Sequence, residues 1–494
     1  SCSESSQVLP GVNINSGKNM YQTQIQGLTS KQSSEVGMES SIISYSANSL
    51  PQGNFTISNN SRITPVKKQH HTSEHIVTDA SGAKQIFNIP VYSIQEKSVV
   101  FNNSNASIDG RKQASYTAGT DNSTSNNKGL DKLYSSTIIP GYATSYLLRA
   151  MLSSDYYDRT NNGLTEDDYG SYIKINHTCV YDESNPFKWR SPYSSGTPGS
   201  GGFPKAIFVD NLKSYSDDNY AAYEYGSKEL WYTHSIEGKE HIALFYLDNR
   251  DDMFSVLGED GGRDLTKPGK LLKKIVLFSK EDLIKHGANA EPLQTVEFIY
   301  DYSLCKGFDG NKNSASLDNT SGKLTLKKIF VNTSRSKEGQ ESKFEFVYNE
   351  GNFNYNPINT DRWGGYNNTS FAGMDNFDFP YVDQSLPSNH SSFSAWNLTE
   401  IFLPGGGKIA VEYESDDYAF VEDHSSMLFT SVTKMGHVNE KSAHATLANS
   451  NFAKDPTSKK PHNVVYFRLP EEITAATLAE GKDKLYDRYL KPIY

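Results

Sequence analysis

The chain of 494 residues carries 58 acidic and 48 basic side chains, a formal net charge of -10 that is spread along the sequence. A mild and dispersed negative charge argues against a nucleic-acid-binding surface, and no apolar run approaches the length of a membrane-spanning helix. Hydrophobic residues make up 36% of the chain, and 31 Tyr and 24 Phe are prominent in the composition. Aromatic side chains suit half-buried pleated sheets, so the composition favours a β-rich fold.

The three cysteines, Cys2, Cys179 and Cys305, are too few for a disulfide framework, and their spacing fits no zinc motif. Few cysteines with abundant Ser, Asn, Thr and Tyr suggest an exported bacterial surface protein that is held together by packing. The chain opens without an initiator Met or a signal peptide, and its first Cys is not at the position that a mature lipoprotein requires. We therefore expect a piece of a longer chain or a processed product.

The first 135 residues are expected to form two segments. Residues 1–65 are rich in Ser, Asn and Gln, a composition that is disordered when free in solution; thin strands laid on a larger sheet are the alternative that we favour. Residues 66–135 are expected to form a β-meander over 75–101, followed by a low-complexity polar loop over 102–128.

Residues 136–468 are expected to form a repeated β-hairpin shell region. It opens with a strand over 138–155, where the periodicity also fits a helix but the aromatic content favours a strand.

Four copies of one hairpin pattern recur in this region, at 230–247, 271–302, 324–349 and 398–414. In each, an extended apolar run leads to a polar or Pro/Gly turn, and apolar residues then alternate at period two toward a Tyr. A single hairpin is marginal in water. We therefore expect antiparallel pairs in one continuous curved sheet, with the aromatic faces inward and with Val411 and Tyr413 in the core.

Two short helices are expected, near 279–287 and 470–491. In the first, Ser279 is the expected N-cap and Gly287 the terminator. The second belongs to a carboxy-terminal segment, 469–494; Pro470 takes its first position and acidic residues fill its opening turn.

An acid-rich loop over 158–168 carries the candidate metal site, with calcium as the expected ion. Oxygen-bearing side chains at alternate positions, a Gly at the sharp turn and further acids follow the logic of a calcium loop. The candidate ligands are Asp158, Thr160, Asn162, the Leu164 carbonyl, Glu166 and Asp168. The pattern departs from an EF-hand because Tyr169 stands where the bidentate Glu belongs, so a solvated Asx-turn loop is the alternative.

Two other polar clusters are expected to be structural. His71 and His75 match the H-x-x-E-H spacing of inverted zinc proteases, but a strand holds such imidazoles too far apart for a common ion. The acid-rich stretch 248–264 suggests an ion site or a glycosidase acid pair, although a solvated loop is the commoner meaning of such a run. Neither a nucleophile elbow nor a Cys–His pairing stands out, so we expect no catalytic residue and no intrinsic enzymatic activity.

The repeated hairpin resembles the RHS/YD-repeat family, whose units run from an apolar stretch through a Pro/Gly turn to a strand ending in Tyr and an acid or amide. From about residue 75 onward, an ordered series of segments is similar to very large Bacteroidota proteins related to RHS and toxin-complex B-subunit shells. These segments are TDASGAKQIFNIPVYS, SYLLRAM, LTEDDYGSY, ELWYTHSIEGKEHIALF, TVEFIYDYSLC, LTLKKIF, DRWGGY and LPGGGKIAVEYESDDYAFVED.

The resemblance implies a wall of spiralling β-hairpins, exported by the type IX route and secreted from, or held on the outer surface of, a Gram-negative bacterium. In RHS proteins such a wall encloses a toxin. YD repeats proper are sparse in this chain, and neither an aspartyl self-cleavage motif nor a toxin domain is evident. Cargo would therefore belong to the remainder of a larger polypeptide.

These sequence features and the resemblance lead to two hypotheses for the function, which belong to different classes of protein. The favoured one is a non-enzymatic scaffold that encloses or presents a toxin or other cargo, with the rest of a larger polypeptide, secretion-system components or surface molecules as partners. The alternative is a cell-surface glycan-binding or adhesion module, whose exposed Tyr and Trp would stack on sugars.

Overall fold

A computed structural model shows that the chain is mostly β, with 17 strands in one large antiparallel sheet that does not close on itself. The prediction of a mostly β fold with antiparallel strands in one continuous sheet is confirmed. No helix among the described residues is long and apolar enough to cross a membrane. The structure describes residues 23–35, 42–50, 57–104, 106, 108–160, 163–196, 204–209, 218–333, 343–351, 353–360, 364–368, 392, 394–414, 420–421, 424–425, 432–436, 445–446, 464–467, 469 and 472–490.

The strands fall into an earlier and a later set along the chain. The earlier set is β1 (Gln24–Thr29), β2 (Ile42–Tyr45), β3 (Ile57–Asn60), β4 (Thr72–Thr78), β5 (Lys84–Asn102), β6 (Gln113–Ser115), β7 (Tyr134–Leu152), β8 (Tyr172–Tyr181), β9 (Phe187–Ser191), β10 (Lys205–Val209) and β11 (Tyr220–Lys228). The later set is β12 (Leu230–Glu237), β13 (His241–Gly258), β14 (Gly261–Ser279), β15 (Gln294–Leu304), β16 (Lys323–Thr333), β17 (Lys343–Tyr348), β18 (Leu398–Phe402), β19 (Lys408–Ala410), β20 (Phe420–Val421), β21 (His424–Ser425), β22 (Val432–Gly436), β23 (Ala445–Thr446) and β24 (Val464–Phe467).

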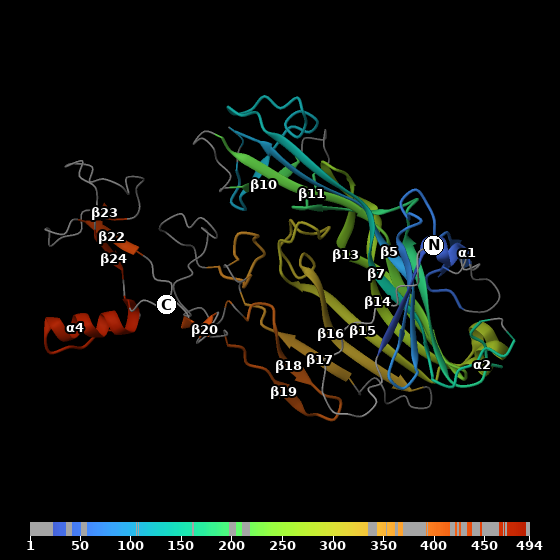
Figure 1. Ribbon diagram of the computed structural model, residues 1–494. Coiled ribbons are helices and arrows are strands. Elements are labelled where there is room, and N and C mark those ends of the chain that lie inside the picture. The colour runs from blue at the N-terminus through green and yellow to red at the C-terminus, as the bar shows by residue number, and fades with distance from the viewer. Residues whose placement is uncertain are drawn as a thin grey trace, which may run out of the picture. The chain divides into compact units, whose positions relative to one another are not determined.

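Strand β5 organises the first part of the sheet (Figure 1). It pairs along nearly its whole length with β7, and its other side pairs with β4 at one end and with β11 at the other. Strand β11 pairs in turn with β9 and β10, and β1 pairs with β4. Alternation near the end of β5 buries Val99 and Phe101, while Ser98 before them is exposed and Val100 between them is only partly buried, which is the pattern expected of a strand with one covered face.

The sheet continues from β7 through β8 and β12 to β13, which pairs with β14 along most of both strands. The four predicted hairpins are present as the antiparallel pairs β12–β13, β14–β15, β16–β17 and β18–β19. The stretch expected as a strand over 138–155 is also a strand, β7.

The buried core does not lie where the aromatic hairpin at 398–414 predicts it. Strands β18 and β19 share only three residue pairs, and β19 ends at Ala410. Ile409 is 47% exposed and Tyr413 is 42% exposed, whereas Val411 is partly buried. The prediction that Tyr413 belongs to the core is wrong: Ile409, on the same face and inside β19, is exposed as well, so the described residues do not cover this face of the hairpin.

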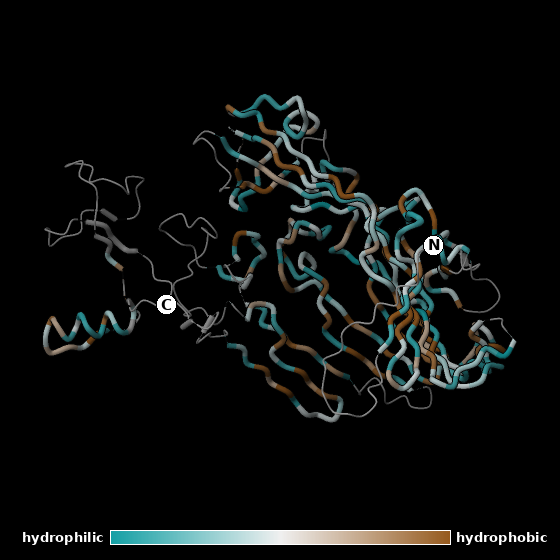
Figure 2. Tube along the Cα trace, in the orientation of Figure 1, coloured by the Kyte–Doolittle hydropathy of each residue, from teal (hydrophilic) through white to brown (hydrophobic). Residues whose placement is uncertain are grey.

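Two apolar clusters form the core instead, and Figure 2 shows apolar and hydrophilic residues alternating along the strands that carry them. One lies where β5, β6, β10 and β11 meet. The other lies where β13 and β14 meet the short helix α2 (Lys280–His286). The first cluster is Val99, Phe101, Ala114, Tyr116, Ala206, Ala221 and Tyr223. The second is Ile242, Leu244, Val276, Phe278 and Leu283.

The helices are few and short. They are α1 (Ser30–Glu35), α2 (Lys280–His286), η1 (Gly287–Asn289), α4 (Leu478–Leu485) and η4 (Tyr486–Leu490). The helix expected near 279–287 is α2: it follows Ser279 and ends at Gly287, whose φ of 55° is strained for other residues.

The carboxy-terminal helix begins later than Pro470, where it was expected. Its N-cap is Thr477, whose hydroxyl accepts from Glu480 N at 3.2 Å, while the Glu480 carboxylate accepts from Ala476 N at 3.0 Å. The sequence Thr-x-x-Glu is therefore the starting signal, and it outweighs a Pro several residues upstream.

By its internal contacts the chain divides into two compact units, Ser1–Val347 with Glu400–Ala410, and Tyr348–Thr399 with Val411–Tyr494. Within the first unit, β1 pairs with β4, so the segments expected at 1–65 and 66–135 share one sheet. The second unit holds the sheet of β22, β23 and β24, the pair β20–β21, and the helix α4.

We predict that Phe101→Ala lowers the free energy of unfolding by about 3–5 kcal/mol, because it leaves a cavity in a fully buried cluster. The matched control in the same sheet is Ile139→Ala on β7, which is 45% exposed and should cost less than about 1 kcal/mol. Urea unfolding followed by tryptophan fluorescence measures both variants. Equal losses would contradict the position of the core.

Candidate functional site

The acid-rich loop between β7 and β8 is organised around one carboxylate, Asp168, which is 3% exposed. Its Oδ2 accepts from the Tyr156 hydroxyl at 2.7 Å and from Thr165 N at 2.9 Å, and its Oδ1 accepts from Arg159 N at 3.3 Å. The bond from the Thr165 backbone is the largest contribution that lowers the pKa of Asp168 below its ordinary value. Asp168 therefore holds the loop's own polypeptide in place.

The other expected ligands follow the same pattern where the structure describes them. Asp158 Oδ2 accepts at 2.9 Å from the backbone of the Gly at the turn. The Thr160 hydroxyl donates to Asp167 Oδ2 at 3.2 Å, and Glu166 lies 3.5 Å from the Lys280 ammonium. Asp158, Thr160 and Asp168 thus share one loop, whereas Glu166 is directed toward α2.

Two expected ligands complete the set. Leu164 lies partly buried in the described part of the loop, and Asn162 lies outside the described residues. Across the described part of the chain, no group of three or more His, Cys, Asp or Glu is placed to hold a metal ion. Calcium binding by this loop remains a prediction, one that also requires backbone and amide oxygens.

We predict that calcium titration of the purified chain gives a binding heat that Asp158→Ala removes, because calcium loops take carboxylate oxygens as ligands. Isothermal calorimetry makes the measurement. Asp79→Ala is the control, since Asp79 also closes a turn, with Ser81 and Ala83, and lies outside the loop. A silent wild-type chain would leave the loop as an Asx-turn without a metal.

The H-x-x-E-H segment is extended, as expected, because β4 begins at Thr72. His71 stacks on Tyr92, with its Nδ1 3.1 Å from the Tyr92 hydroxyl, whereas His75 packs edge-on against Tyr146. Each imidazole has its own aromatic partner. The arrangement is structural and does not resemble a zinc site.

The Glu of the same segment enters a buried ionic cluster. Glu74 is 2% exposed, and its Oε2 lies 3.9 Å from Arg62 Nη2; burial raises the pKa of Glu74 although the Arg62 charge opposes it.

On β8, burial lowers the pKa of His177 to about 4, and the positive charge of Arg149 acts in the same direction. His177 is therefore neutral in the folded chain at neutral pH.

We predict that acid destabilises the fold through His177. Between its ordinary pKa of 6.5 and its folded pKa of about 4, the unfolded chain binds a proton that the folded chain does not. Over that window the free energy of unfolding falls as the pH falls, by up to about 3 kcal/mol.

Urea unfolding from pH 7 to pH 4.5 measures this dependence, and His177→Gln should flatten it. His241→Gln, at an exposed position on β13, is the control and should leave the slope unchanged. A His177→Gln variant with the wild-type slope would contradict the assignment.

The acid-rich stretch 248–264 is not a loop, as the sequence suggested, but the distal part of the β13–β14 hairpin. Arg250 binds Asp252 through both Nε and Nη2, at 2.9 and 2.8 Å. At the hairpin turn, Asp260 accepts from the Tyr116 hydroxyl at 3.0 Å. Paired charges allow an acidic segment to form strands, and these acids are used in tertiary contacts.

The same turn completes a buried tyrosine pair. The rings of Tyr116 and Tyr223 stack with centroids 5.8 Å apart, and the Tyr223 hydroxyl donates to Glu259 Oε1 at 2.5 Å. The Arg190 guanidinium lies 4.5 Å from the Tyr223 ring and donates to the Tyr116 hydroxyl at 3.1 Å. Burial, with the bond to Glu259, raises the pKa of Tyr223.

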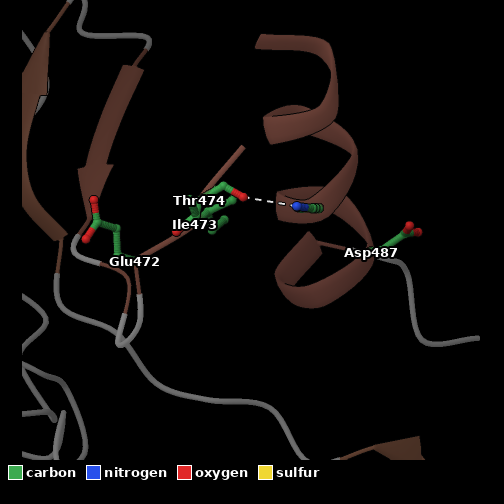
Figure 3. Close-up of a pocket in the computed structure, with 5 residues that line it drawn as sticks. Glu472, Ile473, Thr474 and Asp487 are labelled. Carbon is green, nitrogen blue, oxygen red and sulfur yellow. Dashed lines mark hydrogen bonds between the residues drawn. The ribbon is translucent and has the colours of Figure 1, made fainter. Parts of the chain in front are cut away.

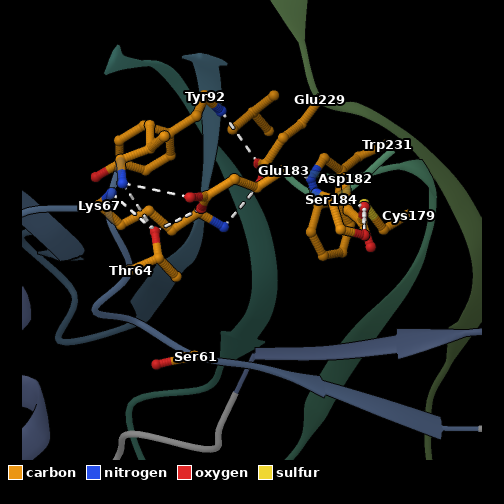
Figure 4. Close-up of polar contacts among 12 residues, drawn as sticks. Ser61, Thr64, Lys67, Tyr92, Cys179, Asp182, Glu183, Ser184, Glu229 and Trp231 are labelled. Carbon is orange, nitrogen blue, oxygen red and sulfur yellow. Dashed lines mark hydrogen bonds and ion pairs between the residues drawn. The ribbon is translucent and has the colours of Figure 1, made fainter. Parts of the chain in front are cut away.

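A second buried ion pair joins Lys67 to Glu229, and Figure 4 shows its surroundings. Lys67 Nζ lies 2.7 Å from Glu229 Oε1, and the two side chains are 4% and 1% exposed. Glu229 Oε2 accepts from Tyr92 N and from Trp231 Nε1, each at 3.2 Å. No local signal in the sequence marks this pair, because Lys67 precedes β4 and Glu229 lies between β11 and β12.

One depression of about 450 Å³ lies beside the carboxy-terminal helix. It is lined by Glu472, Ile473, Thr474, Lys484 and Asp487. Figure 3 shows Glu472 and Asp487 on opposite sides, with their side chains directed apart, while Lys484 donates to the Thr474 carbonyl at 3.0 Å. The lining does not pair a nucleophile with a base.

No protein-family model matches the chain, and no curated protein matches it significantly.

Proposed function

We propose that the chain is a non-enzymatic structural scaffold, part of an exported RHS-like β-shell that encloses or presents a toxin or other cargo. The shell would be secreted from, or held on the outer surface of, a Gram-negative bacterium. Its partners would be the remainder of a larger polypeptide or the enclosed cargo, together with components of a secretion system or the cell surface.

The observation that carries this proposal is the continuity of the sheet. Four hairpins of one sequence pattern belong to a single 17-stranded sheet, and its longest strands, β5 with β7 and β13 with β14, pair along most of their lengths. Backbone hydrogen bonding between long antiparallel strands suits an extended wall more than it suits a compact catalytic domain.

The outer edge of β7 supports the same proposal. Within the described part of the chain, no strand pairs with this edge over residues 135–147, and six consecutive residues, 135–140, are exposed. Ile138 and Ile139 point to opposite faces, so the strand exposes apolar groups on both. Soluble proteins normally cover or charge such edges, and a wall that continues with further strands would cover this one.

A specific observation favours the alternative function, a glycan-binding or adhesion module. Tyr157 and Tyr169 face each other across an isolated antiparallel bridge at the mouth of the acid-rich loop, and they are 64% and 60% exposed. Directly opposed residues have neighbouring side chains, and tyrosine rings stack on sugars. A calcium ion in the loop would add hydroxyl coordination beside them.

We predict that the native polypeptide, isolated from producing cells with an antibody against this chain, protects other segments from proteinase K. Protection should end when mild denaturant opens the sheet. The purified chain should bind no polysaccharide and turn over no glycan or peptide substrate.

Polysaccharide binding by the purified chain would contradict the scaffold if the Tyr157→Ala/Tyr169→Ala double variant loses it without a change in melting temperature. Tyr486→Ala is the control, because it removes an exposed tyrosine far along the sequence from the loop. Uniform digestion of the native polypeptide would also count against the shell.

A further inference from the structure

We infer that Lys67 and Glu229 form an intramolecular isopeptide bond, an amide between Nζ of Lys67 and Cδ of Glu229. The nucleophile and the electrophile are already in contact, since Nζ lies 2.7 Å from Oε1. Both side chains are almost completely removed from water. This matters because amines and carboxylic acids in water remain ionised, whereas a dry site disfavours the separated charges and removes the solvent that would hydrolyse an intermediate.

The two oxygens of Glu229 have different partners. Oε1 faces Lys67, while Oε2 accepts from two N–H donors, the Tyr92 backbone and Trp231 Nε1, each at 3.2 Å. Two fixed N–H donors on one carboxyl oxygen are the arrangement that stabilises the oxyanion of an acyl-transfer intermediate. The geometry therefore assigns Oε2 as the oxygen that is retained and Oε1 as the oxygen that leaves.

The segment that carries Lys67 is held in place by a third group, Glu183. Its Oε2 accepts from the Thr64 hydroxyl at 2.5 Å and its Oε1 from Val66 N at 3.3 Å, and Thr64 Oγ1 accepts from Lys67 N at 3.0 Å. The Lys67 ammonium also lies 5.4 Å from the centre of the Tyr92 ring, and Figure 4 shows the two side chains next to each other. Such positioning replaces a bimolecular encounter with a unimolecular step.

The reaction needs no other reactant. The Lys67 ammonium first transfers a proton to Oε1, which gives a neutral amine and a carboxylic acid. The nitrogen lone pair attacks Cδ, and the negative charge collects on Oε2 between its two N–H donors. A second proton moves from nitrogen to Oε1, the Cδ–Oε1 bond breaks, and one water molecule leaves as the amide forms.

Other Lys–Glu pairs of the described chain lack this combination. Lys97 pairs with Glu259 at 2.7 Å, but their side chains are 18% and 28% exposed, and the Tyr223 hydroxyl donates to the same oxygen that Lys97 contacts. Lys280 and Glu237 are each 14% exposed. The Lys67–Glu229 pair thus differs from these pairs because it is almost completely buried and because two N–H groups donate to Glu229 Oε2.

The test is the intact mass of the purified, folded full chain. The expected mass is lower than the sequence mass by one water molecule, and proteolysis followed by tandem mass spectrometry should give a branched peptide that joins Lys67 to Glu229. Lys67→Arg should restore the full mass. Trp231→Phe removes one oxyanion donor and should slow the loss of water by at least tenfold when chains that have never folded, recovered from inclusion bodies in urea, are first refolded, while Lys97→Arg, the control, should leave the rate unchanged.

The readout on the wild-type chain does not depend on whether any variant folds. A wild-type chain with the full sequence mass, and with a cooperative unfolding transition that shows it is folded, would overturn the inference. A loss of water that maps to an Asp-Gly sequence such as Asp109-Gly110, as a cyclic imide, would overturn it equally.

Discussion

The pairing of β5 with three other strands is the constraint on which the first unit depends. Because β7 runs along one side while β4 and β11 share the other, the register of β5 fixes the positions of all three. A slip by one residue would turn Val99 and Phe101 to the opposite face and direct Ser98 into the core. Gly226 on β11 reinforces the register, since a Cβ there would lie 2.7 Å from both the Gln95 carbonyl and the Trp189 ring. Close approach between strands leaves little tolerance for an alternative pairing.

The interior that this register creates is unusually polar, and charged groups within it are matched in pairs. Lys67 with Glu229 and Arg62 with Glu74 are both removed from water. For the Arg62–Glu74 pair, removing one partner costs roughly 3–5 kcal/mol, because the other charge stays buried alone, whereas the intact pair adds little net stability. These residues therefore contribute mainly to the specificity of the fold and little to its net stability. A chain with modest apolar content gains a specific fold in this way.

The sequence allowed the hairpins to be predicted but not the location of the core. Alternation at period two identified four antiparallel pairs, because it reports directly on which side of a strand meets solvent. The prediction failed for Tyr413, because alternation shows which residues share a face but not whether another layer covers that face, and Ile409 on the same face of β19 is exposed too. It also failed for 248–264, where an acidic composition concealed strands whose charges are paired, such as Arg250 with Asp252.

The buried pair beside Tyr92 could not have been found from the sequence. Lys67 and Glu229 are ordinary residues in their own segments, and they meet because β11 pairs with β5 beside Tyr92 while the segment before β4 lies over the same tyrosine. By contrast, the acid-rich loop was found by its spacing, although the structure uses Asp168 for hydrogen bonds within the loop. Local sequence patterns predict local geometry. Contacts between distant segments depend on the register of strand pairing, which no short stretch of sequence specifies.

The turn of the β13–β14 hairpin also determines when the buried pair Tyr116 and Tyr223 can complete its hydrogen bonds. Glu259 and Asp260 accept the hydrogen bonds of Tyr223 and Tyr116, which lie earlier in the chain. A ribosome delivers the amino-terminal part first, so these buried hydroxyls lack their acceptors until residue 260 has emerged. Long-range closure of this kind slows folding. The buried tyrosine pair therefore reaches its final hydrogen bonding only after the hairpin has been synthesised.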